Sequence, residues 1–330
     1  MYYIWLNFTL ILLSLLSIFF IDKIPKYLVV YDQPDNYRKI HLKPVPLIGG
    51  IILFVSIFTN TLILHNYFDI SIKILLIFTV LLFGFFIIGF LDDKFILSPT
   101  KKTFLIIFFL LLVLPLENSF IIKSLLFKNI DAIIVLNETS VFFTVLCLYF
   151  IYNFLNFSDG ANGITISLCI FWTLVFIFFG NLNQFFLIII LIWLIFVLIF
   201  NLSEKLFIGN SGSSFLSILF GVLFILNYNH DYTIKCDEIL LMMFIPAVDS
   251  LRVIIERMFK GISPFHPDKT HLHHLLLVFC NAKIVFIPYI LFASLPYVSN
   301  LYIDNSLYIL LISSVIYFSC IVFLKKLKIN

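Results

Sequence analysis

Four of the seven histidines in this chain stand close together in the segment SPFHPDKTHLHHLL, residues 263–276. They are His266, His271, His273 and His274. The last three lack the i, i+4 spacing of a helical zinc pair, and neither cysteine nor glutamate accompanies them, so a zinc site is disfavoured. Imidazole N–H groups instead suit phosphate oxygens. We expect His271 to make the main phosphate contact, His273 and His274 to support it, and His266 to be a loop residue.

Two adjacent carboxylates, Asp92 and Asp93, end an apolar run in the segment GFLDDKF. A carboxylate at the end of a lipid-embedded span is costly and usually functional. Two neighbouring carboxylates also repel each other unless a cation lies beside them. They indicate a cation site, but a solvated helix end with Lys94 as the partner explains the same pattern. The motif alone does not decide between the two.

Amide and acid side chains recur every third residue in the segment NFLNFSDGANGI. These are Asn153, Asn156, Asp159 and Asn162, interrupted by Gly160 and Gly163. A spacing of three places side chains on one face of a helix, and glycine permits a turn and a close approach to a ligand. The segment predicts a polar network at a ligand site, and a plain polar turn with glycine stops is the alternative.

Two further segments offer partners for phosphate. LFIGNSGSSFL places small residues before an apolar run, and free N–H groups at such a helix start suit phosphate oxygens. A plain helix cap by Ser213 or Ser214 is the alternative. YRKIHLKPVPLIGG carries Lys39 and His41 in a loop punctuated by proline and glycine, which suits polyphosphate or anionic lipid headgroups. With the acids, these segments indicate Mg²⁺-dependent phosphoryl transfer.

The elements that position these residues are apolar helices. Hydrophobic residues make up 62% of the chain and charged residues only 12%, whereas a soluble domain carries about 25% charged residues. We predict an all-α polytopic membrane protein, a single domain over residues 1–330, with 10 or 11 transmembrane helices. The predicted spans are 4–21, 47–64, 73–91, 103–116, 140–156, 164–180, 184–201, 214–228, 238–254, 284–298 and 305–324.

The distribution of positive charge orients these spans. With the N-terminus outside, the 21 Lys and Arg residues fall on the cytoplasmic side except Lys73, Lys123, Lys128 and Lys235. This bias follows the positive-inside rule and places every polar segment described above at the cytoplasmic face. A transporter, the main competing class, would place polar residues near mid-span and show inverted repeats. The chain shows neither pattern.

In their order along nearly the whole chain, the motifs resemble those of the polyprenyl-phosphate N-acetylhexosamine-1-phosphate transferases, the MraY–WecA type of glycosyltransferase family 4. The matching segments are RKIHLKP with GG, LDD, NxxDGxNG, GNxGS and SPFxPDxxHxHHLL, and the last favours the WecA-like branch. The resemblance implies a bacterial inner-membrane enzyme that transfers N-acetylhexosamine 1-phosphate from a UDP-sugar to polyprenyl phosphate, usually undecaprenyl phosphate. UMP is released, and a cell-envelope polysaccharide such as O-antigen is begun. Mg²⁺ or Mn²⁺ as cofactor, membrane lipids as partners, a homodimer and no nucleic-acid partner are further implications.

The resemblance also assigns roles to residues. It implies catalytic roles for Asp92, Asp93, Asp159 and His271. It implies substrate contacts for Lys39, His41, Asn156, Asn162, Asn201, Phe207, His273 and His274, with Phe207 on the uracil ring. It implies metal contacts for Asp93, Asp159 and Asn210. Asn210 replaces the aspartate of the family, so we expect weaker metal binding. A homologue that binds its substrates without catalysis is the second alternative.

Overall fold

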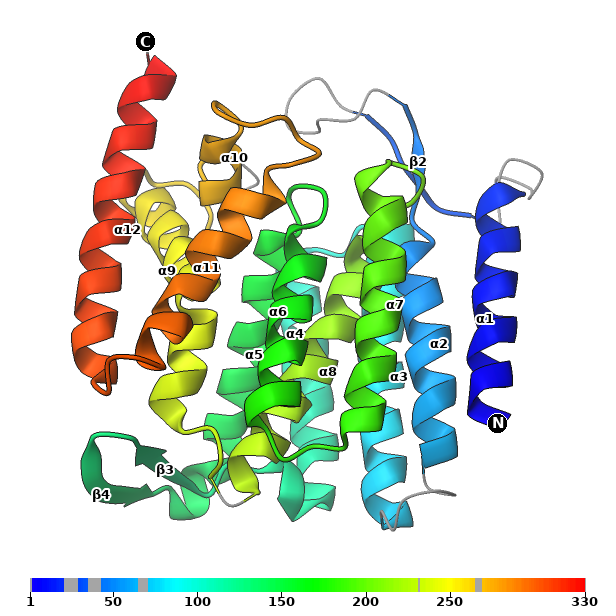
Figure 1. The fold of residues 1–330 in the computed structure, drawn as a ribbon, viewed down its shortest axis with the longest axis horizontal. Helices are drawn as coiled ribbons and strands as arrows, with labels where there is room; N and C mark the ends of the chain where they lie inside the picture. Colours follow the sequence, from blue (N-terminus) through cyan, green and yellow to red (C-terminus); the bar gives the residue numbers. More distant parts are fainter. Residues whose placement is uncertain are drawn as a thin grey trace.

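The computed structural model describes residues 2–20, 29–34, 43–64, 71–230, 232–264 and 269–329. Its helices form one bundle, with the N-terminus at the lower end and the C-terminus at the upper end of the view in Figure 1. Lys39, His41 and His266 lie outside the described residues. The roles predicted for these three side chains therefore stay predictions.

Most of the described chain is helical. The helices are α1 (Tyr2–Phe19), α2 (Gly49–Leu64), α3 (Ile72–Phe95), α4 (Pro99–Val113), α5 (Ser140–Ser158), α6 (Ile164–Phe179), α7 (Gln184–Leu202), α8 (Gly209–Asn229), α9 (Cys236–Phe259), α10 (Leu272–Leu276), α11 (Phe286–Asn300) and α12 (Ser306–Ile329). Each of the eleven predicted spans coincides with one helix to within about one and a half turns, and α10 is the additional short helix.

The length and composition of these helices confirm an all-α, polytopic membrane fold. Six helical stretches in the described chain are long and apolar enough to cross a bilayer, namely 72–95, 99–116, 137–158, 184–202, 209–229 and 306–327. Three shorter apolar helices cover 5–19, 49–62 and 164–179. Helices α9 and α11 coincide with the other two predicted spans, and each contains a proline. The total of 10 or 11 crossings stays a prediction.

Two short antiparallel hairpins accompany the helices. Strand β1 (Tyr31–Asp32) pairs with β2 (Val45–Pro46), and β3 (Ser124–Phe127) pairs with β4 (Ile130–Val135). The β3–β4 hairpin lies at the lower end of the bundle, opposite β2 (Figure 1). These hairpins were not predicted, since each strand is too short to stand out from the apolar sequence around it.

Helix α8 lies at the centre of the bundle. In its most apolar stretch of 18 residues, 83% of the residues are buried. Its first turn approaches α2 and α3 closely. A Cβ atom on Gly50 would lie 2.4 Å from the Gly212 nitrogen, and one on Gly89 would lie 2.3 Å from the Asn210 carbonyl oxygen. Small residues at such contacts let membrane helices touch backbone to backbone. These glycines bring the end of α3 to the start of α8.

Candidate functional site

The partner of Asp92 is Lys102, in the second turn of α4. Asp92 is buried at the end of α3, where its Oδ2 accepts a hydrogen bond of 2.7 Å from the Lys102 ammonium. Its Oδ1 accepts a 2.8 Å hydrogen bond from the Leu97 N–H. Lys94, the partner suggested by the sequence, is exposed and lies over the Phe95 ring. Asp92 is thus buried in an ion pair with the half-buried Lys102 and is not at a solvated helix end.

Asp93 caps the N-terminus of α8. Its Oδ1 accepts from the Asn210 N–H at 2.7 Å, and its Oδ2 accepts from the Ser211 N–H at 2.9 Å. Gly209 permits this contact, because its φ is +63° and a Cβ there would lie 2.8 Å from Asp93 Oδ2. A carboxylate is favourable at this end of a helix. The two N–H groups that the sequence offered to a phosphate therefore bind Asp93.

The serine caps considered from the sequence are wrong. Ile208 is the N-cap residue of α8 and makes no side-chain cap, while Ser213 and Ser214 lie inside the helix. The Ser213 hydroxyl donates instead to the Asn210 carbonyl at 3.4 Å. The acid that caps this helix comes from α3, more than a hundred residues earlier in the chain.

Asn156 of α5 joins this region through its amide. Its Nδ2 donates to Asn210 Oδ1 at 3.1 Å and contacts Ser213 Oγ at 3.4 Å. Asn210, which stands where the family motif has an aspartate, is thus bonded to the neutral amide of Asn156. The two predicted site residues Asn156 and Asn210 are in direct contact, which sequence spacing could not show.

The turn between α5 and α6 carries Asp159, Asn162 and Gly163. Asp159 is the half-buried C-cap of α5, and Asn162 is also half-buried. Gly163 has a φ of +80°, and its N–H donates to Asn201 Oδ1 at 2.7 Å. Asn201 Nδ2 donates onward to the Leu206 carbonyl at 3.3 Å. Asn201 is buried and ties this turn to the α7–α8 connection, so its contacts are structural.

Asn201→Leu should lower the free energy of unfolding by about 1–3 kcal/mol, because the Gly163 N–H and the Leu206 carbonyl would lose their buried partner. Thermal unfolding in detergent measures this loss. Asn162→Leu, in the same turn but half-buried, is the matched control and should cost less than about 0.5 kcal/mol. Equal losses in the two variants would contradict the structural role of Asn201.

Phe207 lies in the same α7–α8 connection. Its N–H donates to the Pro46 carbonyl at 3.0 Å, and its carbonyl accepts from the Gly49 N–H at 2.9 Å. The side chain is half-buried. The backbone of Phe207 is therefore fixed between β2 and the start of α2, and its predicted contact with a uracil ring stays a prediction.

The histidines lie against the turn that follows α5. The His271 and His273 rings stack with centroids 5.5 Å apart and 5° between their planes. A Cβ on Gly160 would lie 2.3 Å from His273 Nε2, so the glycine leaves room for that ring. All three histidines of the HLHH sequence are buried. The fold thus brings the HLHH and DGANG motifs into contact.

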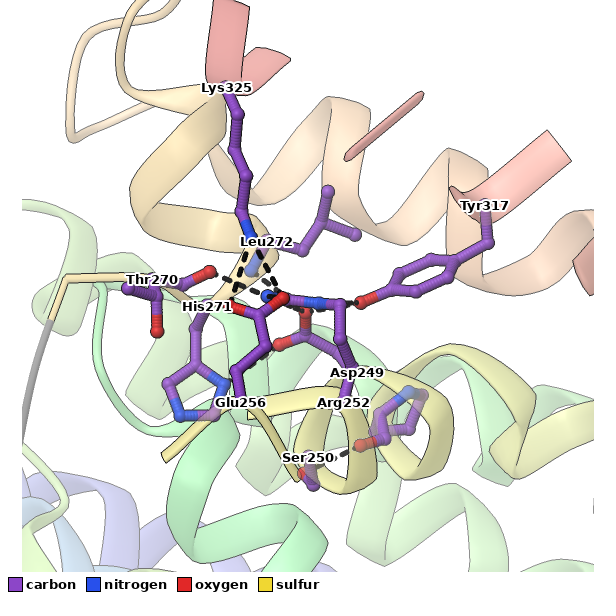
Figure 2. Close-up of polar contacts among 10 residues, drawn as sticks. Asp249, Ser250, Arg252, Glu256, Thr270, His271, Leu272, Tyr317 and Lys325 are labelled. Carbon is purple, nitrogen blue, oxygen red and sulfur yellow. Dashed lines mark hydrogen bonds and ion pairs between the residues drawn. The ribbon is translucent and has the colours of Figure 1, made fainter. Parts of the chain in front are cut away.

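His271 is held from behind by Asp249 of α9. His271 Nδ1 lies 2.8 Å from Asp249 Oδ2, and both side chains are buried (Figure 2). Asp249 and Arg252 were missed as site residues. Both are charged residues within an apolar run of the sequence, and charges inside a membrane span often mark functional sites. This pattern could have identified them from the sequence.

A small polar pocket lies between α4 and α5, next to the Asp92–Lys102 pair. Its volume is about 160 Å³, and it is lined by Leu97, Pro99, Lys102, Thr103, Tyr152, Asn153, Asn156 and Phe157. Tyr152 is buried, and its hydroxyl has no hydrogen-bond partner among the described residues. The Lys102 ammonium lies 5.4 Å from the centre of the Tyr152 ring. We name this cavity the Lys102 pocket.

The donor set fits a Mg²⁺ ion shared with substrate, and not one enclosed by protein alone. In the part of the chain that the structure describes, no group of three or more His, Cys, Asp or Glu side chains could hold a metal ion. Both Asp93 oxygens accept backbone N–H groups, and Asn210 Oδ1 accepts from Asn156. Mg²⁺ often uses one or two carboxylates plus substrate phosphates. Asp159 can supply such a carboxylate.

The helical bundle gathers acids, amides and histidines at one end, as a site at a membrane surface requires. Residues 74–227 match the model of glycosyl transferase family 4. Over these residues the chain is similar to the family that its motifs resemble.

Among curated proteins, the chain is similar to the undecaprenyl-phosphate alpha-N-acetylglucosaminyl 1-phosphate transferase of Escherichia coli K12. The two are 28% identical over 287 residues, which cover 82% of this chain and 75% of that protein. It is 27% identical to a probable undecaprenyl-phosphate N-acetylglucosaminyl 1-phosphate transferase of Bacillus subtilis, over 81% of this chain and 76% of that protein. The Haemophilus influenzae transferase is 26% identical over 80% of this chain and 76% of its own length.

Proposed function

We propose that this protein transfers N-acetylhexosamine 1-phosphate from a UDP-sugar to a polyprenyl phosphate and releases UMP. The Lys102 pocket is the observation that carries this proposal. It combines a half-buried ammonium with a buried hydroxyl, and Asn156 links it to Asn210. An ammonium has three donors, and Lys102 gives one to Asp92. The donors that Asp92 does not use can bind the phosphate of the acceptor lipid.

An apolar cavity is suited to the isoprenoid chain of that acceptor. It has a volume of about 350 Å³ and lies between α5, α8, α9 and the β3 strand, with an almost wholly apolar lining that includes Phe150, Phe154, Phe224, Met243 and Leu251. Phe154 of this cavity is the chain neighbour of Asn153 in the Lys102 pocket. Helix α5 therefore presents a lipid surface and a polar pocket next to each other.

The reaction exchanges one phosphoanhydride for another. An oxygen of the lipid phosphate attacks the β-phosphorus of the UDP-sugar, and the bond to the bridging oxygen breaks. That oxygen leaves on UMP with the bonding electrons. The attacking phosphate is largely dianionic near pH 7, so no strong base is needed. The protein acts by positioning and charge neutralisation, with Lys102 at the acceptor and His271 at the donor diphosphate.

Mg²⁺ would be held by Asp159 and by the amide oxygen of Asn210, together with substrate phosphates, and would neutralise charge on the diphosphate. Asp93 is a weaker metal candidate in this proposal, because its oxygens cap α8. Mn²⁺ is the expected substitute for Mg²⁺. A homodimer stays a family-level prediction.

The proposed location is the bacterial inner membrane, with the N-terminus outside and the site facing the cytoplasm. The uneven distribution of Lys and Arg supports this orientation. The N-terminus of α1 and the α10 segment lie at opposite ends of the bundle (Figure 1), which is compatible with it.

The proposed reaction is tested with purified protein, Mg²⁺, undecaprenyl phosphate and a panel of UDP-N-acetylhexosamines. UMP release and a lipid-linked sugar phosphate from at least one donor are expected. The Escherichia coli relative serves as the positive control in the same detergent. If that control forms product and this protein forms none with any donor, the catalytic proposal is wrong, and a protein that only binds its substrates is favoured.

Asn210→Asp should tighten Mg²⁺ or Mn²⁺ binding by about tenfold, because an added carboxylate raises the ligand charge of the site. Titration of Mn²⁺ followed by electron paramagnetic resonance measures this directly, with or without turnover. Asn305→Asp adds the same charge at the exposed start of α12, where Asp can still accept from the Tyr308 N–H, and is the control. If the two variants bind Mn²⁺ equally well, Asn210 does not lie at the metal.

A further inference from the structure

The His271 ring is the inner end of a buried polar network that extends into α9 and α12 (Figure 2). Asp249 Oδ2 lies 2.8 Å from His271 Nδ1. Asp249 Oδ1 accepts three hydrogen bonds, from the Leu272 N–H at 3.0 Å, from Arg252 Nη2 at 2.8 Å and from the Tyr317 hydroxyl at 2.7 Å. Oδ2 of this carboxylate therefore contacts His271, and Oδ1 is fixed by hydrogen bonds from the loop, α9 and α12.

Arg252 connects this carboxylate to the loop that carries the histidines. Its Nη2 also donates to the Thr270 carbonyl at 2.7 Å, directly before His271, and its Nε donates to the Tyr317 hydroxyl at 2.7 Å. Its Nη1 donates to Glu256 at 2.8 Å. The loop, α9 and α12 are thus fixed to one another at the position of His271.

An outer ion pair closes the network toward the surface. Lys325 of α12 lies 2.8 and 2.9 Å from the two carboxylate oxygens of Glu256 (Figure 2). Both partners are partly exposed, with the Lys325 side chain at 38%. Asp249, Arg252 and Tyr317 are instead buried at 6% exposure or less. The buried inner part and the half-exposed outer part can therefore be tested separately.

A carboxylate bound to Nδ1 decides the state of an imidazole. An ionised aspartate only accepts hydrogen bonds, so the Nδ1 of His271 must carry a proton to bind Asp249. In the neutral ring, Nε2 is then the unprotonated atom, since the two nitrogens of a neutral imidazole share one proton. Among the described residues, no hydrogen bond to Nε2 of His271 is formed. Nε2 is the nitrogen left for a substrate, and it donates to a phosphate oxygen in the imidazolium form, in which both ring nitrogens carry protons.

We propose that Asp249 is a positioning residue of the transferase reaction. It holds His271 by Nδ1 in a fixed orientation and protonation pattern, and Arg252 and Tyr317 hold Asp249 in turn. The Tyr317 hydroxyl accepts from Arg252 and donates to Asp249, so the last helix of the described chain is part of the site. The kinetic half of this proposal rests on the proposed function.

The first test observes the ring itself and needs no turnover. The protein is labelled with ¹⁵N-histidine, and the His271 signals are assigned by their loss in His271→Asn. Wild type is expected to show a protonated Nδ1. In Asp249→Asn the oxygen must stay with the three donors at Oδ1, so the amide NH₂ faces His271. Nδ1 of His271 then accepts a hydrogen bond from this amide, and the proton of the neutral imidazole ring moves to Nε2.

The second test separates kcat from KM. Asp249→Asn should lower kcat by at least about tenfold, the scale on which an orienting partner of a histidine acts. The KM for polyprenyl phosphate should stay within about twofold, because the Lys102 pocket contains none of these residues. In a His271→Asn background, Asp249→Asn should cause no further loss of kcat, because coupled residues are not additive. Lys325→Met, at the half-exposed end, is the matched control and should leave kcat unchanged.

The outcomes distinguish this proposal from the proposed function. If no UDP-sugar yields product but Asp249→Asn inverts the protonation pattern of His271, the reaction is wrong and the orienting contact stands. An unchanged protonation pattern in Asp249→Asn overturns the positioning role. Losses of kcat that multiply in the double variant overturn it as well. Tyr317→Phe removes one hydroxyl without burying a new polar group. It provides a second, milder variant that should lower kcat in the same direction if Asp249→Asn fails to fold.

Discussion

Lys102→Met should lower kcat/KM for sugar-phosphate transfer by at least about 10³-fold, the upper scale for removing one preorganised donor of a charged group. The ammonium lies in the wall of the Lys102 pocket and is fixed by Asp92 at 2.7 Å. Methionine keeps most of the length of the side chain and removes only the charge and the donors. Initial rates over a range of polyprenyl phosphate concentrations measure the loss.

Lys101→Met is the matched control for this prediction. Lys101 precedes Lys102 in α4 but is exposed, so its replacement should change the rate by no more than about twofold. If both variants lose activity equally, a general effect of positive charge at the membrane surface would explain the data. The Lys102 pocket would then not be the acceptor site.

Lys102→Met also leaves Asp92 buried without its partner, and breaking a buried ion pair costs about 3–5 kcal/mol of stability. The double variant Asp92→Asn with Lys102→Met removes both charges and separates the two effects. It should recover most of the lost thermal stability in detergent and none of the lost activity. Recovery of activity together with stability would show that the ion pair is only structural.

His271→Asn should lower kcat by about 10²–10³-fold, as expected for the loss of one group that stabilises developing charge, while leaving the melting temperature close to that of wild type. The amide nitrogen of asparagine can take the place of Nδ1 and donate to Asp249, but nothing replaces Nε2. His271→Gln reverses the pattern, because its amide nitrogen takes the place of Nε2 and the Asp249 contact is lost. The glutamine variant should therefore be less stable and retain more activity than the asparagine variant.

His230→Asn is the control for the histidine prediction. His230 follows the last turn of α8, whose first turn lies at the site, and the 21 helical residues between them span about 30 Å. No change in rate is expected. A His271→Asn enzyme that turns over at the wild-type rate would remove this histidine from the proposed mechanism.

Hydropathy alone was enough to predict the helices. In lipid, each spanning segment must satisfy its own backbone hydrogen bonds, so a long apolar run has to be a helix wherever it packs. The predicted spans 184–201 and 164–180 accordingly coincide with α7 and α6. The β3–β4 hairpin escaped prediction because its strands are short and distant residues hold them, such as Tyr228, whose hydroxyl accepts from the Leu126 N–H at 2.8 Å and donates to the Ser124 carbonyl at 2.7 Å.

The motifs also placed the polar segments at one end of the bundle, because alternating spans leave little freedom in which side each loop occupies. His273 against Gly160 and Asn156 against Asn210 are contacts of this kind. What the motifs could not show is which side chain each acid would meet. The sequence motif predicts that Asp93 is a metal ligand. In the fold, however, both of its carboxylate oxygens accept backbone N–H groups from the first turn of α8.

The amino-acid sequence by itself determined the class of protein, the positions of its helices and the set of loops proposed to form its site. Only the tertiary structure decided the pairings inside that site. Asp92 with Lys102 and His271 with Asp249 join residues 10 and 22 positions apart, and Asp249 with Tyr317 spans 68. Such pairings depend on which helices pack together and on the glycines that let them approach. Contacts between helices in lipid depend on side-chain shape and hydrogen bonding more than on hydrophobicity. The pattern of apolar residues along the sequence predicts neither the fit between side chains nor the hydrogen bonds between helices.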